Sequence, residues 1–250
     1  MDFSNKTALI TGSGQGVGEG IARAIASYGG NVSLVGRTLS KVESVADQIN
    51  QDGGSAIAIE CDVKCNESIN KSIKATLSKF NSLNILVNNA QEVPLGNILD
   101  VTDESFINGW DSGPLATFRF MKACHPYLKG GGKVINLASS SALRPDSKSY
   151  GAYAAVKESI RSLSRAAAVE WGPDNILVNC IMPLAKSTGM DWWMNEHPDE
   201  ANEFLKTIPL GRVGECKDDI GEAVCHILSD GMNYITGSTI MLDGGQAYLR

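Results

Sequence analysis

The sequence predicts a doubly wound α/β fold, in which helices cover both faces of a parallel sheet. Short apolar runs rich in β-branched residues alternate with amphipathic helical patterns along the whole chain. The runs are continuously apolar, which is typical of strands buried on both faces. Helical connections of the usual right-handed kind then make neighbouring strands parallel. No linker, low-complexity tract or internal repeat breaks the rhythm, which favours a single domain over residues 1–250.

The expected elements follow from this rhythm in chain order. Each apolar run is short, and each is followed by a turn or by the polar start of a helical pattern. We expect strands at residues 7–10, 31–35, 56–60, 83–87, 133–137, 176–181 and 239–242, and helices at residues 18–28, 39–50, 67–80, 106–128, 153–171 and 218–228.

One stretch, at about residues 184–210, departs from the rhythm. It is longer than a usual connection, and it carries Trp192, Trp193 and Phe204. Long inserts beside the carboxyl ends of strands are where lids and substrate walls are built, so we expect a substrate lid here. The alternative is a small satellite core under a helical excursion.

The composition excludes several classes of protein. Hydrophobic residues make up 43% of the 250, and the 26 glycines show no three-residue period, which excludes disordered, collagen-like and coiled-coil chains. The formal net charge is −6 without a basic stripe, which argues against a nucleic-acid or anionic-membrane binder but not against a small anionic ligand. No apolar run approaches the roughly 18 residues of a membrane span. The first residues do not form a signal peptide, so we expect a soluble cytoplasmic protein.

The six cysteines are scattered without C-x-x-C spacing, and the chain has three histidines. Reduced, packed cysteines are therefore expected, and no metal site.

A glycine-rich turn at residues 11–18 follows the first expected strand and opens the first expected helix. Its glycines permit a tight turn and close approach to a pyrophosphate, while the helix N-terminus adds amides and partial positive charge. The spacing is G-x-x-x-G-x-G rather than G-x-G-x-x-G, but the position at the first strand–helix junction makes the signal strong. The turn residues expected to bind a dinucleotide are Gly12, Ser13, Gln15, Gly16, Val17 and Gly18.

The end of the second expected strand bears on which nucleotide is bound. A carboxylate for the adenosine ribose is expected there, but the sequence has Arg37 instead. A guanidinium can pair with a 2′-phosphate, so NADP(H) is preferred, with NAD(H) as the alternative. Asp62, after the third strand, is placed to accept a hydrogen bond from adenine, and its neighbour Val63 is included in the same site.

Tyr153 and Lys157 stand four residues apart at the start of an expected helix, so both project from one face. A free phenol has a pKa near 10, but a neighbouring ammonium and the positive charge of an oxidised nicotinamide would both favour the phenolate. Tyr153 could then act as an acid/base. Upstream, the fifth strand leads into three serines, Ser139, Ser140 and Ser141, at the carboxyl edge of the sheet. A hydroxyl there can hydrogen-bond a substrate oxygen, and no partner for a nucleophilic triad is evident.

These residues together resemble the classical short-chain dehydrogenase/reductase family. The likeness covers nearly the whole chain in order: residues 11–18, Asp62, Asn88-Asn89-Ala90, Ser139 or Ser140, Tyr153, Lys157, Pro183, Thr188 and Asp243-Gly244-Gly245. It implies a Rossmann-type subunit, usually part of a homotetramer, that moves a hydride between a nicotinamide and a carbonyl/alcohol pair.

The resemblance also implies residue roles. Tyr153 exchanges the hydroxyl proton, Lys157 holds the nicotinamide ribose, and a serine positions the carbonyl. Asn88, Asn89 and Ala90 line the adenosine side, while Pro183 and Thr188 lie on the other side of the cofactor. The expected substrate pocket includes Gln91, Tyr150, Trp192 and Trp193, with Val93 and Leu143.

Two assignments stay open. The residue spacing from the strand makes Ser139 the catalytic serine, whereas the spacing back from Tyr153 makes it Ser140. Spacing along a strand varies less than spacing across a loop, which favours Ser139. Tyr150 makes Y-x6-K with Lys157, the spacing of enoyl reductases, but those relatives usually have a degraded glycine turn.

Three positions depart from the family pattern. Gly113 stands where a fourth catalytic residue, an Asn, is expected; Gln91 and Leu184 each replace a glycine. The leading hypothesis remains an NADP(H)-dependent carbonyl reductase or alcohol dehydrogenase. Because Gly113 replaces the expected catalytic Asn, two alternatives remain: an NADP(H)-binding protein with little turnover, and an atypical reaction. The intact glycines and Lys157 count against a dehalogenase-like lyase on the same fold.

Overall fold

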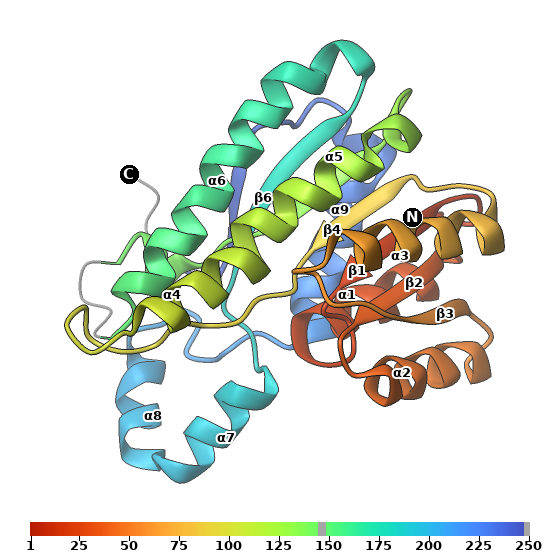
Figure 1. Ribbon diagram of the computed structural model, residues 1–250. Helices are drawn as coiled ribbons and strands as arrows, with labels where there is room; N and C mark the ends of the chain where they lie inside the picture. The colour runs from red at the N-terminus through yellow and green to blue at the C-terminus, as the bar shows by residue number, and fades with distance from the viewer. Residues whose placement is uncertain (145–148, 248–250) are drawn as a thin grey trace.

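The computed structural model describes residues 1–144 and 149–247, which form an α/β structure around a seven-stranded sheet (Figure 1). The strand order is β3-β2-β1-β4-β5-β6-β7, and every pairing is parallel. The predicted doubly wound sheet is confirmed. The strands are β1 (Thr7–Thr11), β2 (Asn31–Gly36), β3 (Ser55–Glu60), β4 (Ile85–Asn88), β5 (Lys133–Leu137), β6 (Leu177–Pro183) and β7 (Thr239–Leu242).

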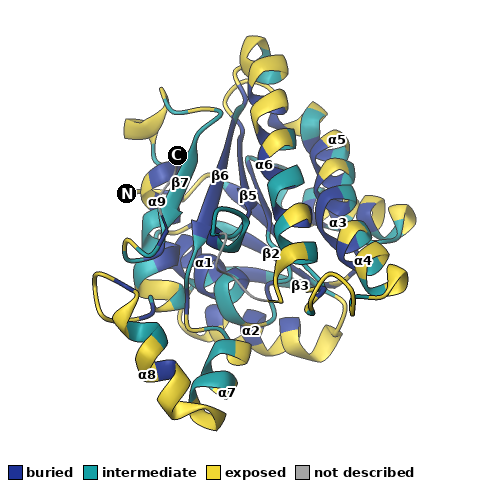
Figure 2. Ribbon diagram, turned by 90° about the vertical axis from the view of Figure 1, so that its left-hand side faces the viewer, coloured by how far each residue is buried: buried dark blue, intermediate teal, exposed yellow. Residues whose placement is uncertain are grey.

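The helices lie in two layers, one on each face of the sheet. Figure 2 shows the buried strands between α5 and α6 on one side and α1 and α9 on the other. Each layer has its own apolar core, since α1, α2 and α9 pack on one face and α3, α5 and α6 on the other. The helices are α1 (Gly16–Ser27), α2 (Leu39–Gln51), α3 (Asn66–Phe80), α4 (Asp103–Trp110), α5 (Ala116–Leu128), α6 (Gly151–Trp171), α7 (Thr188–Glu196), α8 (Pro198–Lys206) and α9 (Glu222–Leu228).

The helix predicted at residues 106–128 is interrupted, and this corrects the sequence-based expectation. A π turn, η1 (Asp111–Leu115), separates α4 from α5. Pro114 lies within it, and because proline lacks an amide hydrogen the ordinary helical bonding cannot continue through this residue. A second π turn, η4 (Cys216–Gly221), precedes α9.

The insert predicted at residues 184–210 contains α7 and α8, which project from one end of the molecule in Figures 1 and 2. Ala201 is the only buried residue in these two helices. Trp193 packs edge-on against Phe204, with ring centres 5.6 Å apart, while the Trp192 side chain is exposed. Part of the insert therefore forms a small apolar contact of its own, as the satellite-core alternative predicted.

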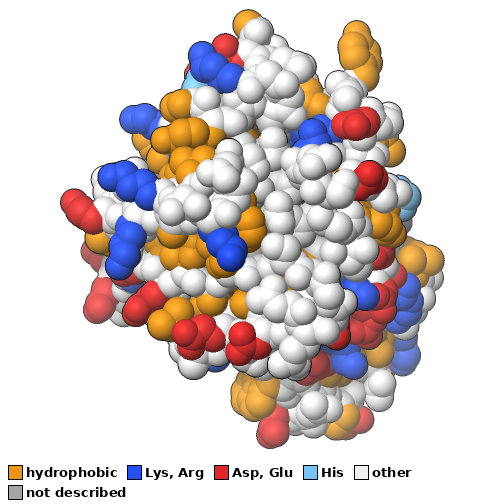
Figure 3. Space-filling model, turned by 90° about the vertical axis from the view of Figure 1, so that its right-hand side faces the viewer, with side chains coloured by type: hydrophobic (Ala, Val, Ile, Leu, Met, Phe, Trp, Pro, Cys, Tyr) orange, Lys and Arg blue, Asp and Glu red, His pale blue; other side chains and the backbone are white. Residues whose placement is uncertain are grey.

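Charged side chains of both signs are mixed on the face drawn in Figure 3, and no continuous basic stripe crosses it. Across residues 1–144 and 149–247, no helix combines the length and apolar character needed to cross a bilayer.

Helix α1 crosses η4 at very close range. A Cβ on Gly20 would overlap the carbonyl of Cys216, and one on Gly221 would lie 2.6 Å from the carbonyl oxygen of Gly20. Both obstacles are backbone, which cannot rotate away. The crossing therefore depends on glycine in both helices.

We expect Gly20→Ala to destabilise the protein by about 1–3 kcal/mol, because the two helices must separate. Thermal unfolding would show this as a fall of roughly 2–4 °C per kcal/mol. Gly172→Ala is the matched control, since nothing lies within 4 Å of a Cβ placed there. An equal melting temperature for the two variants would contradict the explanation.

Candidate active site

A groove of about 510 Å³, here called the main groove, lies at the carboxyl end of the sheet. It opens where β1 meets β4, the point at which the strand order reverses. Open α/β sheets bind ligands at such switch points. Its lining residues are Gly12, Gly14, Gln15, Gly16, Val17, Gly36, Arg37, Thr38, Lys41, Val42, Cys61, Asp62, Val63, Asn89, Ala90, Gln91, Glu92, Val93, Ser112, Tyr153, Ser187, Thr188 and Gly189.

The glycine turn forms the floor of the main groove. Gly12 and Gly16 have φ values of +65° and +62°, a conformation that side chains rarely adopt. The turn leads directly into α1, whose N-terminal amides and dipole favour an anion. This backbone has the positive-φ glycines and the helix N-terminus that a pyrophosphate site requires, and the binding of a pyrophosphate stays a prediction.

Asn89 ties the turn to the end of β4. Its Nδ2 donates to the carbonyls of Thr11 and Gly12, both at 2.9 Å, and its backbone amide donates to Thr11 Oγ1. A Cβ on Gly18 would lie 2.5 Å from the same Nδ2. Gly18 is thus needed for packing inside the turn, and it does not line the groove.

Ser13 is fully buried and turned away from the main groove. Its hydroxyl donates to the carbonyl of Ile10 and accepts from the amide of Val35, both at 2.9 Å. The Ser13 side chain therefore links β1 to β2, and the prediction that Ser13 binds the cofactor stays a prediction.

Three cations and one carboxylate surround the outer end of the main groove. Arg37 donates to Glu92 Oε1 at 2.6 Å, and Lys64 Nζ lies 3.1 Å from the same oxygen. Lys41, one turn into α2, donates to Gln15 at 2.7 Å. No carboxylate follows β2, and the cations at this end of the groove could pair with a phosphate.

Asp62 and Val63 line the wall of the groove beyond β3, as predicted. The Asp62 carboxylate accepts from the amide of Lys64 at 2.9 Å, which fixes the loop. On the opposite side, Ser187 caps α7 and lies against the glycine turn, since a Cβ on Gly16 would meet its Cβ at 3.7 Å. Thr188 lines the groove next to it, whereas Pro183 does not.

Tyr153 and Lys157 lie one turn apart on α6, with Lys157 Nζ 5.6 Å from the centre of the Tyr153 ring. Tyr153 lines the groove; Lys157 is buried and donates to the carbonyl of Leu137 at 2.7 Å. Burial raises the pKa of Tyr153 to about 12, although a hydrogen bond with Ser139 acts in the opposite direction. Burial lowers the pKa of Lys157 to about 8. The protein groups alone thus do not lower the pKa of Tyr153.

The serines after β5 differ in their surroundings. Ser139 is half-buried, is hydrogen-bonded to Tyr153, and accepts from the amide of Ser141 at 3.2 Å. Ser140 is buried, with 5% of its surface exposed. Tyr150 occupies the N-cap position of α6, with its ring centre 6.0 Å from that of Tyr153. Neither Tyr150 nor the two tryptophans of the insert line the main groove.

Several groove residues escaped the sequence analysis. Thr38 and Lys41 follow Arg37 within one turn, so the start of the helix after β2 was a usable signal. Glu92, Ser112 and Ser187 carry no local signal, because only the folded chain brings them to the groove.

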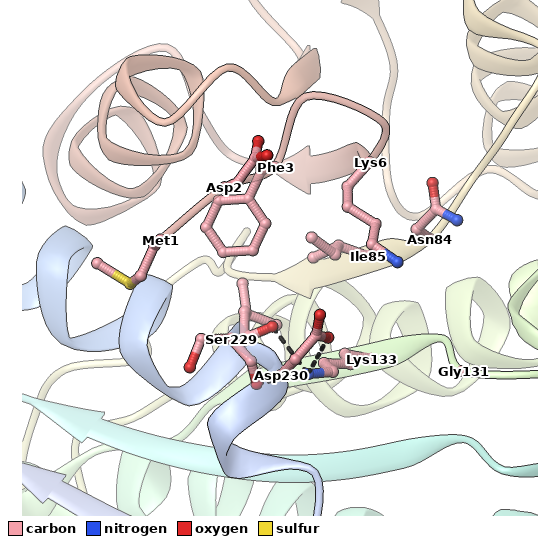
Figure 4. A pocket seen from close by; sticks show the side chains of 11 residues that line it. Met1, Asp2, Phe3, Lys6, Asn84, Ile85, Gly131, Lys133, Ser229 and Asp230 are labelled. Atoms are coloured by element: carbon pink, nitrogen blue, oxygen red, sulfur yellow. Dashed lines mark hydrogen bonds and ion pairs between the residues drawn. The ribbon is translucent and has the colours of Figure 1, made fainter.

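A second hollow, of about 230 Å³, lies at the opposite, amino end of the sheet (Figure 4). Lys133 Nζ donates there to the carbonyls of Leu228 and Ser229, both at 2.8 Å, at the end of α9. A cation is favourable at a helix C-terminus, so Lys133 acts as a structural cap.

Comparisons with known proteins match nearly the whole chain. A family model described as enoyl-(acyl carrier protein) reductase matches residues 12–247. A 12α-hydroxysteroid dehydrogenase from a Clostridium species is 36% identical, with 97% of each chain covered. A putative short-chain alcohol dehydrogenase from Sinorhizobium meliloti has a TM-score of 0.90 at 31% identity, covering 98% of this chain and 97% of that one. A 3-ketoacyl-(acyl-carrier-protein) reductase from Brucella melitensis, complexed with NADH, has a TM-score of 0.88 at 29% identity, covering 97% and 98%.

Proposed function

Since the chain belongs to the short-chain dehydrogenase/reductase family, we propose that it transfers a hydride between NADP(H) and a ketone or secondary alcohol. The observation that carries the proposal is the placement of Tyr153, with Lys157 one turn away, in the same groove as the glycine turn. A phosphate-binding turn and a titratable hydroxyl in one groove are what a dehydrogenase requires.

The residue roles in this proposal are those that the family resemblance implies, and the geometry of the groove supports them. When bound, NADP(H) supplies or accepts the hydride. Tyr153 donates its hydroxyl proton to the substrate oxygen in reduction and takes it back in oxidation. Ser139, hydrogen-bonded to Tyr153, orients the same oxygen. Lys157 retains donors beyond its bond to Leu137 with which to hold the nicotinamide ribose.

The electrostatics of Tyr153 make its acid form the resting form in this proposal. Burial favours the neutral phenol and opposes the phenolate. The nearby ammonium of Lys157 and the positive charge of an oxidised nicotinamide act in the other direction. The phenolate is therefore favoured only when the oxidised cofactor is bound, which suits a group that must return its proton.

The cofactor in this proposal is NADP(H) rather than NAD(H). Arg37 and Lys41 line the outer end of the groove, Lys64 is paired with Glu92 there, and Thr38 occupies the N-cap position of α2. A 2′-phosphate at this point would accept hydrogen bonds from two N–H groups of the Arg37 guanidinium and from the amides at the start of α2. NAD(H), which one related structure contains, is the alternative.

The proposed substrate is bulky and hydrophobic. The loop after β4, which lines the groove at Val93, continues with Leu95, Ile98 and Leu99, all of them exposed. Ile98 lies beside the start of α6, since a Cβ on Gly151 would meet it at 3.2 Å. Apolar side chains next to Tyr153 suit a steroid or acyl-chain substrate, the classes named for two relatives.

Consumption of NADPH with a panel of carbonyls tests the function. The panel contains a 12-oxo steroid, a 3-oxoacyl thioester, a small aliphatic ketone and a 2-enoyl thioester. We expect turnover of a large ketone above that of the small one. Turnover of the enoyl thioester alone would replace the proposal with the enoyl reduction named for the family model. Tight NADPH binding without turnover of any carbonyl would favour the second candidate, a cofactor-binding protein. The reason to consider this candidate is that Gly113 replaces the expected catalytic Asn.

Ser139→Ala and Ser140→Ala separate the two candidate serines. We expect Ser139→Ala to lower kcat by about 10²-fold, the scale for losing one donor to a developing oxyanion. Ser140→Ala removes a buried hydroxyl and is expected to change the melting temperature more than kcat. Steady-state kinetics and thermal unfolding of both variants give the comparison, and the reverse pattern would transfer the role to Ser140.

Assembly and compartment complete the proposal. The exposed apolar side chains of Ile107, Trp110 and Phe118 on α4 and α5 support a homo-oligomer, a tetramer or a dimer. All six cysteines are free thiols, which suits the reducing cytoplasm.

A further inference from the structure

Gly113 and Gln91 occupy one shared space behind the main groove. Gly113 is buried within the π turn η1. A Cβ placed on it would overlap Gln91 Oε1 and would lie 2.9 Å from Cδ and 3.0 Å from Nε2 of the same amide. A side chain at position 113 and the Gln91 carboxamide therefore exclude each other. The two departures from the family pattern form one structural unit.

The orientation of the Gln91 carboxamide is determined by its partners. Nε2 donates to the carbonyl of Glu92 at 2.6 Å and to the carbonyl of Gly109 at 2.8 Å. The opposite orientation would set an oxygen against two carbonyl oxygens, so it is excluded. Oε1 consequently faces Gly113, where it is buried and has no hydrogen-bond partner among the described residues.

The loop after β4 is attached to the α4–η1 helix on both sides of this contact. A Cβ on Gly109, one turn before Gly113, would lie 2.7 Å from Pro94. Ser112 Oγ accepts from the amide of Glu92 at 2.9 Å and donates to the carbonyl of Asn108. Two glycines one turn apart thus present a flat helix face, and residues 91–94 lie directly upon it.

This loop lines the same groove as Tyr153. Gln91, Glu92 and Val93 line the groove together with Tyr153 and Ser112. A displacement of the loop by a fraction of an ångström would alter where a substrate lies relative to Tyr153, and activity is sensitive to such shifts.

We propose that Gln91 is a positioning residue, whose carboxamide takes the space of a side chain at position 113 and holds the loop after β4 in register with Tyr153. The inference rests on the proposed function for its catalytic consequence. The structural part, the exchange of one side chain for another across the contact, stands on the geometry alone.

A double-mutant cycle tests the exchange: Gln91→Gly, Gly113→Asn and the double variant. We expect Gly113→Asn to lower the melting temperature and to lower kcat/KM about 10- to 100-fold, because its side chain displaces the amide. Gln91→Gly removes the hydrogen bonds of the carboxamide to Glu92 and Gly109, and its kcat/KM is expected to fall by about 10-fold. The double variant should recover most of both losses, since one amide again occupies the space. Additive losses in the double variant would overturn the proposal.

A matched cycle uses Gly172→Asn with Gln91→Gly. Position 172 has nothing within 4 Å of a Cβ, so these two changes are expected to be additive. If the coupling free energy were equal in both cycles, it would not come from the contact between Gln91 and position 113. The effect of Gln91→Gly would then be a general structural one.

The Michaelis constant separates positioning from folding. Fewer folded molecules would lower kcat in proportion and would leave the KM for the carbonyl unchanged. We expect Gln91→Met, of similar volume but without the amide, to raise that KM at a temperature where the protein is fully folded. An unchanged KM would overturn the positioning role. If the wild-type protein reduces no carbonyl of the panel, the proposed function fails, and the melting temperatures of the cycle still decide whether the side chains exchange.

Discussion

Tyr153→Phe should lose hydride transfer while it still binds NADPH. The ring stays in place on α6, but the proton that the substrate oxygen needs is gone, and such a group typically contributes about 10²–10⁴-fold. Single-turnover oxidation of bound NADPH measures the loss, and fluorescence titration measures the affinity. A fall in both quantities together would indicate a damaged groove rather than a missing acid.

Tyr150→Phe is the comparison for this variant. The two rings are 6.0 Å apart, but only Tyr153 lines the main groove and is hydrogen-bonded to Ser139. We expect Tyr150→Phe to act on the KM of the carbonyl more than on kcat. Retained turnover in Tyr153→Phe, with loss in Tyr150→Phe, would transfer the acid/base role to Tyr150.

Arg37→Asp should reverse the preference for NADPH. The variant removes a guanidinium and places a carboxylate where a ribose hydroxyl could bind. Charge-assisted hydrogen bonds are worth about 1.5–3 kcal/mol, which corresponds to roughly a 10- to 150-fold weaker affinity for NADPH. Affinity for NADH should be equal or better. Titration with each cofactor gives the ratio of the NADPH and NADH affinities. An unchanged ratio would contradict the proposal that Arg37 binds the 2′-phosphate.

Glu92→Gln is expected to act in the opposite direction. Glu92 is the carboxylate that pairs with both Arg37 and Lys64, so its neutralisation frees two cations for a phosphate. NADPH should bind more tightly, with little change for NADH. Arg165→Asp makes the same charge change as Arg37→Asp at an exposed position of α6 outside the groove, so it is the net-charge control for Arg37→Asp. A similar loss of NADPH affinity there would mean that the effect of Arg37→Asp is not local.

Much of the fold could be predicted from local sequence, because each buried strand is a short apolar run between helical patterns. The strands at 133–137 and 239–242 have the predicted limits. The expected strand at 83–87 starts instead at Ile85; before it, the Asn84 side chain accepts from the amide of Thr7. The π turns could not be predicted, because residues 106–128 have one continuous amphipathic pattern.

The site was predictable where chemistry depends on neighbours in sequence. The glycine turn, Arg37 and the Tyr153–Lys157 pair are all local patterns, and the fold brings most of them to one groove. Glu92 and Ser112 could not be found, because their importance depends on contacts across the sheet and with the π turn. The contact between Gln91 and Gly113 could not be predicted either, since the two residues are 22 positions apart in the sequence and look like two unrelated departures from the family pattern.

The bonds of Asn89 to Thr11 and Gly12 affect how the groove can move. They join the glycine turn to β4, and the Gln91 ties join the next residues to the α4–η1 helix. The floor and one wall are therefore joined by side-chain hydrogen bonds. The opposite wall is different, because α7 and α8 contain only one buried residue. The α7 side of the groove is thus held by fewer contacts, since Ser187 faces the turn without a hydrogen bond to it among the described residues, and a variant study of cofactor release would begin there.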